Sequence, residues 1–303
     1  MNPCNAIDQA VTVVAVVVTH QPDVKMLTAQ TLALLPQVHR IIWVDNGSSA
    51  VVAQLSSALG VDYINLCKNT GIAHAQNVGA ERAFSAGATH VLLMDHDSVP
   101  AGDMVEQLLL SLDGHPLAAA AGPWYQDPRG QEHSPFVRIE GFRIRRLERP
   151  VGKIAAGEGV AVDHLIASGC LIHREAWDAI GSMADELFID FVDVEWCLRA
   201  RSLGWTVIGV WNAHMEHHLG HAVKTLMGRR FHVHSPARHY FHIRNGIYLA
   251  RQRWIPWSRR WVTGYRLLLK CGFYLLVMDN RRHYLAATLK GAWHAMKFDI
   301  AST

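Results

Sequence analysis

Several features that would quickly assign a chain to a known class are missing from this sequence. Its five cysteines form no C-x-x-C pair, so we expect reduced thiols and no structural zinc site. It contains neither G-x-G-x-x-G nor G-x-x-x-x-G-K-[ST], which leaves a Rossmann dinucleotide site and a P-loop unsupported. No apolar run reaches the roughly 20 residues of a membrane-spanning helix, because Arg266 and Lys270 interrupt the longest candidate.

The composition is that of a folded globular protein. The chain has 303 residues, of which 50% are hydrophobic and 18% are charged, so it is neither disordered nor fibrous. This length fits two domains, or one α/β domain of about 200 to 250 residues with an appendage.

Acidic residues are almost absent from the C-terminal quarter. Residues 229–303 contain 14 of the 29 Lys and Arg but only Asp279 and Asp299 as acids, so this segment carries a net charge of +12 and the rest −9. The segment is also rich in tryptophan and tyrosine. We therefore expect it to contact an anionic surface, either bilayer headgroups or nucleic acid, and to lie on a membrane rather than cross it.

The first half alternates short apolar runs with segments of helical periodicity, which predicts a mostly parallel sheet built from β-α-β units. The expected strands span 11–18, 40–44, 63–66 and 90–94, and the expected helices span 24–35 and 72–86. Polar clusters at 19–23, 45–49 and 95–97 follow three of these strands. Because ligands of parallel sheets bind at the carboxyl ends of the strands, these clusters are candidate binding residues.

The second half is less regular. Residues 122–159 read as a loop-dominated insertion with at most one edge strand, and 166–172 as a strand kinked at Gly169. Helices are expected over 174–180 and from about 190 to Gly204, followed by a strand over 205–210. We expect a catalytic domain over 1–225 and a basic helical extension over 226–303.

Two acids directly after the strand at 90–94 are candidate metal ligands. Asp95 and Asp97 could bind a divalent cation together with a phosphate, although a solvated turn explains a lone D-x-D equally simply. One imidazole from the histidines at 214, 217, 218 and 221, with His217 preferred, could join Asp97 on a borderline metal such as Mn²⁺. For any one of these histidines, packing or exposure to solvent is the simpler alternative.

Nucleotide contacts are expected from the other two clusters and from a glycine-containing run. Thr19 and Asp45 end their strands, and the turn after Asp45 could hydrogen-bond a nucleobase or ribose or be only a turn. In the run Asn69 to Gly79, Gly71 permits a tight turn, and the small residues after it allow a helix to approach the sheet closely. Asn77 lies on that helix and points either to the ligand or into helix packing.

The segment from Phe188 to Arg199 places three carboxylates among large apolar residues. Burying carboxylates is unfavourable unless they are paired or used. Asp190 could cap a helix, one acid could pair with Arg199 or Arg201, and a remaining one is a candidate general base. Further on, Arg238 and Arg244 stand six residues apart among aromatics, where they could bind phosphate or form a basic face toward membrane or solvent.

Taken in this order, these segments resemble family 2 inverting glycosyltransferases of the GT-A fold, and most closely the bacterial rhamnosyltransferases of that family. The resemblance spans residues 10–250 and rests on Asp45-Asn46-Gly47-Ser48, the Asn69–Gly79 run, Asp95-His96-Asp97, Ser168-Gly169 and the Phe188–Arg199 block. One departure is that Val192-Asp193 stands where the family usually has a Glu-Asp pair.

The resemblance implies a metal-dependent transfer of L-rhamnose from dTDP-L-rhamnose with inversion. It implies Asp193 as the base and Asp97 with His217 as ligands of Mg²⁺ or Mn²⁺. The implied donor-binding residues are Thr19, Asp45, Asn69, Gly71, Asn77, Asp95, Arg238 and Arg244. The implied acceptor-binding residues are Ser168, Gly169, Glu195 and Trp196.

The resemblance further implies a glycan or lipid-linked glycan acceptor at the inner face of the cell membrane, reached by a peripheral protein of the cytoplasm. A UDP-sugar hexosyltransferase, a nucleotidyltransferase and an inactive sugar-nucleotide-binding scaffold remain alternatives. A non-catalytic membrane- or nucleic-acid-binding protein is a further one. Nucleic acid is not expected, because the acidic first 228 residues would repel its backbone.

Overall fold

The computed structural model describes residues 10–128, 133–218, 222–226 and 229–298, with only the backbone described at 222–226 and 229–232, so His221 lies outside the described residues. The first half contains β1 (Val13–Thr19), α1 (Val24–Leu34), β2 (Arg40–Asp45), α2 (Ala50–Leu59), β3 (Asp62–Asn65), α3 (Ile72–Ser85), β4 (His90–Asp95), β5 (Ser98–Pro100) and α4 (Met104–Asp113). There follow β6 (Ala118–Gln126), β7 (Phe136–Glu140), β8 (Arg143–Leu147), β9 (Gly159–Ala161), β10 (Cys170–His173), α5 (Arg174–Ile180), the 3₁₀ turn η1 (Asp185–Leu187), α6 (Val192–Ser202) and β11 (Thr206–His217). The chain ends with β12 (Ala222–Leu226), β13 (Arg229–Val233), α7 (Pro236–Arg251), α8 (Trp257–Val277) and α9 (Arg281–Lys297).

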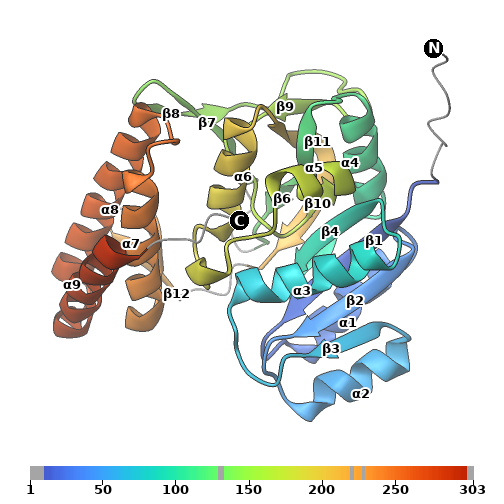
Figure 1. Cartoon of the computed structure of the whole chain (residues 1–303), viewed down its shortest axis with the longest axis horizontal. Helices are drawn as coiled ribbons and strands as arrows, with labels where there is room; N and C mark the ends of the chain where they lie inside the picture. The colour runs from blue at the N-terminus through green and yellow to red at the C-terminus, as the bar shows by residue number, and fades with distance from the viewer. Residues whose placement is uncertain (1–9, 129–132, 219–221, 227–228, 299–303) are drawn as a thin grey trace.

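Nine strands form one mixed sheet in the order β3-β2-β1-β4-β10-β6-β11-β5, with β9 paired to β11 (Figure 1). Strands β1 to β4 are parallel, whereas β10 runs antiparallel to both of its neighbours. The mostly parallel first half that the sequence predicts is therefore confirmed.

Every residue of β1 is buried because helices cover both faces of the sheet. Successive side chains alternate between two hydrophobic clusters, so Val16 packs toward α3 and Val17 toward α1 and α4. Helix α3 comes so close that a Cβ atom at Gly79 would lie 2.2 Å from Val16 Cγ1. The expected close approach of this helix to the sheet is thus confirmed.

The strand register brings three of the polar clusters to one edge of the sheet. Thr19 at the end of β1 lies opposite Asp45 of β2, and Val18 lies opposite Asp95 of β4. The expected common position at the carboxyl ends of the strands is confirmed.

The expected loop over 122–159 is only partly correct. It contains the end of β6 and the β7–β8 hairpin, and β9 begins at its last residue and pairs with β11. The alanine run that opens β6 gives no strand signal, because alanine has low β-propensity. The strand expected over 166–172 begins only at Cys170, because Gly169 has φ +81° and breaks the extended backbone.

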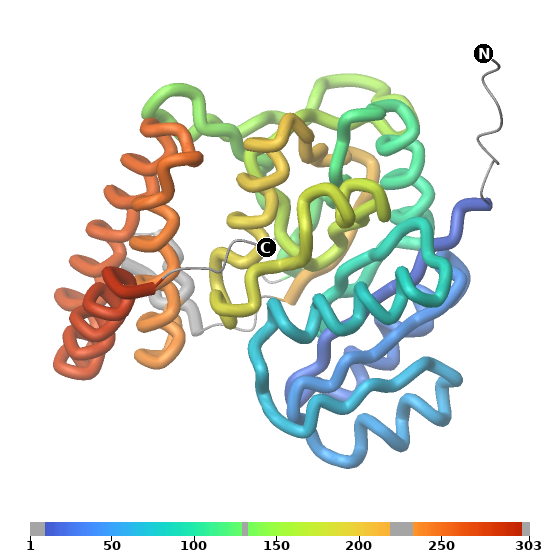
Figure 2. The backbone as a smooth tube through the Cα atoms, viewed as in Figure 1, coloured from blue at the N-terminus to red at the C-terminus, as the bar shows by residue number. Residues whose placement is uncertain are grey.

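Helices α7, α8 and α9 form a group beside α6, away from the sheet edge formed by β3 (Figures 1 and 2). Helix α8 is tied to the rest of the protein by Asp163, which is 0% exposed and bound by Arg259 of α8 and by Arg201 of α6. The boundary expected between 225 and 226 falls inside β12, which pairs with β13, and the division into two domains stays a prediction. In the described part of the chain, no helix is long and apolar enough to cross a membrane.

Candidate active site

A cavity of about 590 Å³ opens at the carboxyl ends of the parallel strands. Its walls come from the ends of β1, β4 and β11, from the loops after β2 and β3, and from the segment that enters α6. Its polar lining includes Asn46, Asn69, Asp95, Asp97, Asp190, Asp193, His217 and Arg238.

Three side chains on one wall of the cavity can hold a metal ion. Ligand atoms of Asp95, Asp97 and His217 all lie within 4.8 Å of one another. Burial acts to raise the pKa of Asp97, but the neighbouring His217 imidazole, 3.4 Å away, prevails and lowers it. The Oδ1 atom of Asp97 is buried and has no hydrogen-bond partner among the described residues, which fits an oxygen that ligates a cation.

The metal-binding group is held by two serines behind it. Ser98 Oγ lies 2.6 Å from His217 Nδ1 and 2.7 Å from Ser168 Oγ, and Ser168 Oγ accepts from the Asp95 backbone N–H at 3.0 Å. Ser168 is 1% exposed and does not line the cavity, and at Gly169 a Cβ would lie 2.5 Å from Pro123. Ser168 supports Asp95 directly and His217 through Ser98, and the acceptor-binding roles expected of Ser168 and Gly169 stay predictions. Ser98 was not predicted, although its position directly after the D-x-D pair offered a signal.

Asp193 lines the same cavity and lies in the first turn of α6. Burial, together with the charges of Asp95 and Asp190, raises its pKa from 3.8 to about 6, although the Val194 N–H donates to Oδ1 at 2.8 Å. Within the part of the chain described, no Lys or Arg pairs with it. Asp193 is therefore a carboxylate poised to take a proton near neutral pH.

Asp190, three residues earlier, has a different environment. Arg238 Nη2 donates to its Oδ1 at 2.8 Å, and Arg238 Nε lies 3.2 Å from both oxygens. Burial acts against ionisation of Asp190, but Arg238, with His242 3.8 Å away, prevails and lowers its pKa. Asp190 and Arg238 both line the cavity as an ion pair, and the expected helix cap at Asp190 is replaced by this pairing.

The segment before α6 is held in an unusual backbone conformation by α7. Phe188, Asp190 and Phe191 all have φ between 63° and 67°, which is unfavourable for residues with side chains. Asn245 Nδ2 of α7 lies 2.9 Å from the carbonyl oxygens of three residues, Leu187, Ile189 and Asp190.

Arg244 takes part in the same support. Its Nη2 donates to the carbonyls of Glu186 and Leu187, and it is 9% exposed. It holds this segment and does not line the cavity, and the expected binding of donor phosphate by Arg244 stays a prediction. Asn245 was missed, although a polar residue on a buried helix face was a usable signal.

The nucleotide-binding candidates fall into two groups. Asn69 and Gly71 line the cavity, and Asn46 joins them, because its Nδ2 donates to Asn69 Oδ1 at 3.2 Å and to the Gly71 carbonyl at 3.1 Å. Gly71 has φ +94°, and a Cβ there would lie 2.7 Å from Phe188, so only glycine fits.

Three other candidates do not reach the cavity. Asp45 is 1% exposed and accepts from Thr19 Oγ1 at 2.9 Å, from the Ser48 N–H and from Tyr63, so Thr19 and Asp45 shape the loop that carries Asn46. The Asn77 amide donates to the Met183 carbonyl and to Asp185 Oδ1, the latter at 2.6 Å, and it accepts from the Met183 backbone N–H. Asn77 therefore takes part in helix packing, the second of the two alternatives that the sequence left open.

Glu195 and Trp196 also point away from the cavity. Glu195 is 3% exposed and forms a double ion pair with Arg199, with both N–O distances 2.9 Å. Trp196 is 1% exposed and donates its indole N–H to the Gly181 carbonyl at 2.8 Å. The helix phase of α6 turns both into the core, where they pack, and their acceptor-binding roles stay predictions.

Comparison with known proteins decides the class. The family model for glycosyl transferase family 2 matches residues 15–181. This chain belongs to glycosyltransferase family 2. This family 2 glycosyltransferase is 32% identical over 244 residues to the dTDP-rhamnosyl transferase RfbF of Shigella flexneri, covering 80% of this chain and 81% of that protein.

Solved structures place the fold among GT-A glycosyltransferases. A structure of S. aureus TarS residues 1–349 matches with a TM-score of 0.57 at 14% identity, covering 94% of this chain and 80% of that one. A structure of GalNAc-T7 with UDP, GalNAc and Mn²⁺ matches with a TM-score of 0.58 at 13% identity, and the match covers 91% of this chain but 58% of that one. The expected fold and enzyme class are confirmed, while the roles of single residues stay predictions.

Proposed function

We propose that this glycosyltransferase transfers L-rhamnose from dTDP-L-rhamnose to a hydroxyl group of a glycan or lipid-linked glycan, with inversion and with a divalent metal. The observation that carries the proposal is that Asp193, with a pKa of about 6, lines the same cavity as the Asp95, Asp97 and His217 group. The similarity to a dTDP-rhamnosyl transferase supports the choice of donor.

In this mechanism, the protein removes one proton and balances charge at the leaving group. Asp193 takes the proton of the acceptor hydroxyl while that oxygen bonds to the anomeric carbon, and the bond from this carbon to the diphosphate oxygen breaks. Mg²⁺ or Mn²⁺, held by Asp95, Asp97 and His217, would neutralise charge on the diphosphate. The dTDP leaves from the face opposite to attack, which inverts the anomeric configuration.

Asp190 and Asp193 have different roles in this mechanism, because only Asp190 is paired with an arginine, Arg238. Because Arg238 binds both oxygens of Asp190 and lowers its pKa, Asp190 is the weaker base, whereas Asp193 has no cationic partner among the described residues. When the environments of two carboxylates shift their pKa values in opposite directions, the carboxylate with the raised pKa is usually the one that exchanges a proton in the reaction.

The test is calorimetric binding of dTDP and UDP, each with Mn²⁺, Mg²⁺ or EDTA, to the wild type and to Asp97→Ala. We expect dTDP to bind more tightly than UDP, only with metal, and not to Asp97→Ala. The control is Asp103→Ala, which removes an exposed carboxylate near the neighbouring strand β5 and should bind normally. Metal-independent binding, or unchanged affinity in Asp97→Ala, would remove the metal from the proposal, and tighter UDP binding would favour a UDP-sugar.

We also propose that α8 and α9 rest on an anionic membrane at the cytoplasmic face. Large apolar side chains on these helices are exposed, among them Trp261 at 57%, Leu268 at 74% and Trp293 at 63%. They occur beside many Arg and Lys, a composition typical of helices that lie in a membrane interface.

A further inference from the structure

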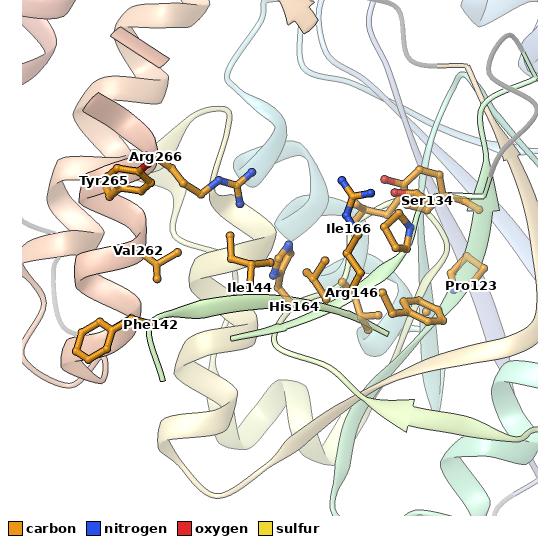
Figure 3. Close-up of a pocket in the computed structure, with 16 residues that line it drawn as sticks. Pro123, Ser134, Phe142, Ile144, Arg146, His164, Ile166, Val262, Tyr265 and Arg266 are labelled. Carbon is orange, nitrogen blue, oxygen red and sulfur yellow. The ribbon is translucent and has the colours of Figure 1, made fainter. Parts of the chain in front are cut away.

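A second cavity, of about 570 Å³, lies between the β7–β8 hairpin, the segment 164–166 and α8 (Figure 3). It adjoins the first cavity, because Ile166 lines both. None of the functions assigned above uses it.

This cavity carries positive charge with no acid to balance it. The side chains of Arg146 of β8 and Arg266 of α8 point into it from different walls (Figure 3). Among the described residues, neither arginine has a hydrogen-bond or ion-pair partner, and no Asp or Glu lines the cavity. Two guanidinium groups from separate elements that face an acid-free cavity are suited to bind a phosphate group.

His164 adds hydrogen-bonding capacity at the base of the cavity rather than charge. Burial lowers its pKa to about 4, so the imidazole is neutral at pH 7 and has one donor and one acceptor nitrogen.

An apolar compartment continues from the charged one. A further cavity of about 400 Å³ shares His164, Val262 and Arg266 with it. Its walls are mainly apolar, with Leu198 of α6 and Phe273 of α8 among them, and Arg259 and Lys270 also line it. A ligand that fills both compartments therefore combines an anionic group with an apolar chain.

The charged cavity also leads to the reacting groups. Tyr125 lines it, and the Tyr125 ring stands 5.7 Å from the His217 ring, centroid to centroid. Ile166 lines this cavity and also the first cavity, which Asp193 lines. A group held at Arg146 and Arg266 can thus extend past Ile166 toward Asp193.

We propose that this cavity binds the acceptor through a phosphate ester carried on an apolar chain, with Arg146 and Arg266 holding the phosphate and the apolar compartment holding the chain. The inference rests on the proposed function in one respect, namely that the bound amphiphile is the acceptor.

The experiment measures binding of farnesyl phosphate in EDTA, where the metal group cannot retain a phosphate. We expect the wild type to bind it, and Arg146→Gln and Arg266→Gln each to bind at least about tenfold more weakly. The matched control is Arg143→Gln, which removes the same charge from β8 at a residue that is exposed like Arg146 and Arg266 but does not line the cavity, and its affinity should change less than about twofold.

Further ligands separate the sources of binding. Farnesol and inorganic phosphate should each bind at least about tenfold more weakly than farnesyl phosphate, since each fills one compartment only. Equal binding of inorganic phosphate would overturn the amphiphile site. Equal, arginine-dependent binding of dioctanoyl phosphatidylglycerol would identify a site for bilayer lipid and overturn the acceptor assignment. Equal losses in Arg143→Gln and the two cavity variants, or no binding by the wild type, would overturn the cavity proposal.

Binding of dTDP with Mn²⁺ is measured on the same variants and should not change. If farnesyl phosphate binds as expected but dTDP does not bind the wild type, the cavity site stands and the proposed function fails. If only dTDP binds, the reverse holds.

Discussion

Asp190 and Asp193 lie three residues apart and line the same cavity, but their environments set opposite pKa shifts. Arg238 keeps Asp190 ionised, whereas burial near Asp95 and Asp190 leaves Asp193 with a pKa of about 6. At the scale of single residues, this contrast selects the candidate base.

Replacing Asp193 by Asn should lower kcat about 10²- to 10⁴-fold, because the acceptor hydroxyl loses its proton acceptor. Affinity for dTDP with Mn²⁺ should stay within about twofold, since Asp193 is not among the metal ligands. In the wild type, kcat/KM should fall as the pH drops below about 6, where Asp193 takes up a proton. Unchanged turnover in Asp193→Asn, measured with dTDP-rhamnose and an active acceptor, would exclude Asp193 as the base.

The same substitution should stabilise the fold. The pKa of Asp193 is raised in the folded state, so the folded wild type loses stability as the pH rises from about 4 to about 6. A rise from 3.8 to about 6 corresponds to up to about 3 kcal/mol of unfolding free energy at pH 7. In urea unfolding with EDTA, Asp193→Asn should exceed the wild type by up to this amount at pH 7 and equal it below about pH 4. An equal difference at both pH values would contradict the shift.

Much of the site could be predicted at this scale because strand ends in a parallel sheet have a fixed location. Asp95, Asp97 and Asn69 therefore lie around one cavity, as expected from their places in the sequence. Glu195 and Trp196 could not be assigned, since whether a helical residue faces the cavity or the core depends on how α6 packs, which residue spacing alone does not determine.

At the scale of elements, the link between α7 and the segment before α6 stands out. One amide of α7, that of Asn245, binds three carbonyl groups of the segment that contains the left-handed residues, so this helix sets the position of the loop that carries Asp190 and leads to Asp193. Long-range contacts of this kind lie beyond the reach of local sequence patterns, and so does the extension of β11 from 210 to His217, which brings the third metal candidate to the site.

Asn245→Ala should loosen this loop, because three carbonyl groups lose their amide donor. We expect a loss of about 1–3 kcal/mol in unfolding free energy. We also expect a lower kcat, while dTDP affinity changes little. The matched control is Asn212→Ala. The Asn212 amide donates to the Ala155 carbonyl at 3.0 Å, neither residue lines the cavity, and the substitution should leave kcat unchanged. A stability loss without any change in kcat would show that the loop does not need this support for turnover.

At the scale of the whole molecule, charge is distributed unevenly. The +12 segment and the −9 remainder give the protein a basic end, and that end carries the exposed tryptophans of α8 and α9. The basic, helical character of this end could be predicted from composition, whereas the packing of α8 and α9 on α7 could not, because it depends on contacts between separate helices that local sequence patterns do not specify.

Co-sedimentation with lipid vesicles should show whether this basic end binds an anionic membrane. We expect binding to vesicles that contain phosphatidylglycerol and loss of most binding in about 0.5 M salt, because each basic residue near the surface contributes about 1 kcal/mol that salt screens. Trp261→Ser should weaken binding, whereas Leu117→Ser, which changes an exposed apolar residue before β6, should not. Equal binding to neutral vesicles would argue against an anionic membrane as partner.

The buried contact of Asp163 with Arg259 constrains how this protein can evolve by recombination. The carboxylate lies inside the region that the family model covers, and the guanidinium lies nearly 80 positions beyond the end of that region. A recombination event with its breakpoint between them would leave a buried charge without its main partner, which typically costs several kcal/mol. Lineages of this protein should therefore inherit the catalytic core and the C-terminal helices together, and diversify their acceptors by substitution rather than by exchange of segments.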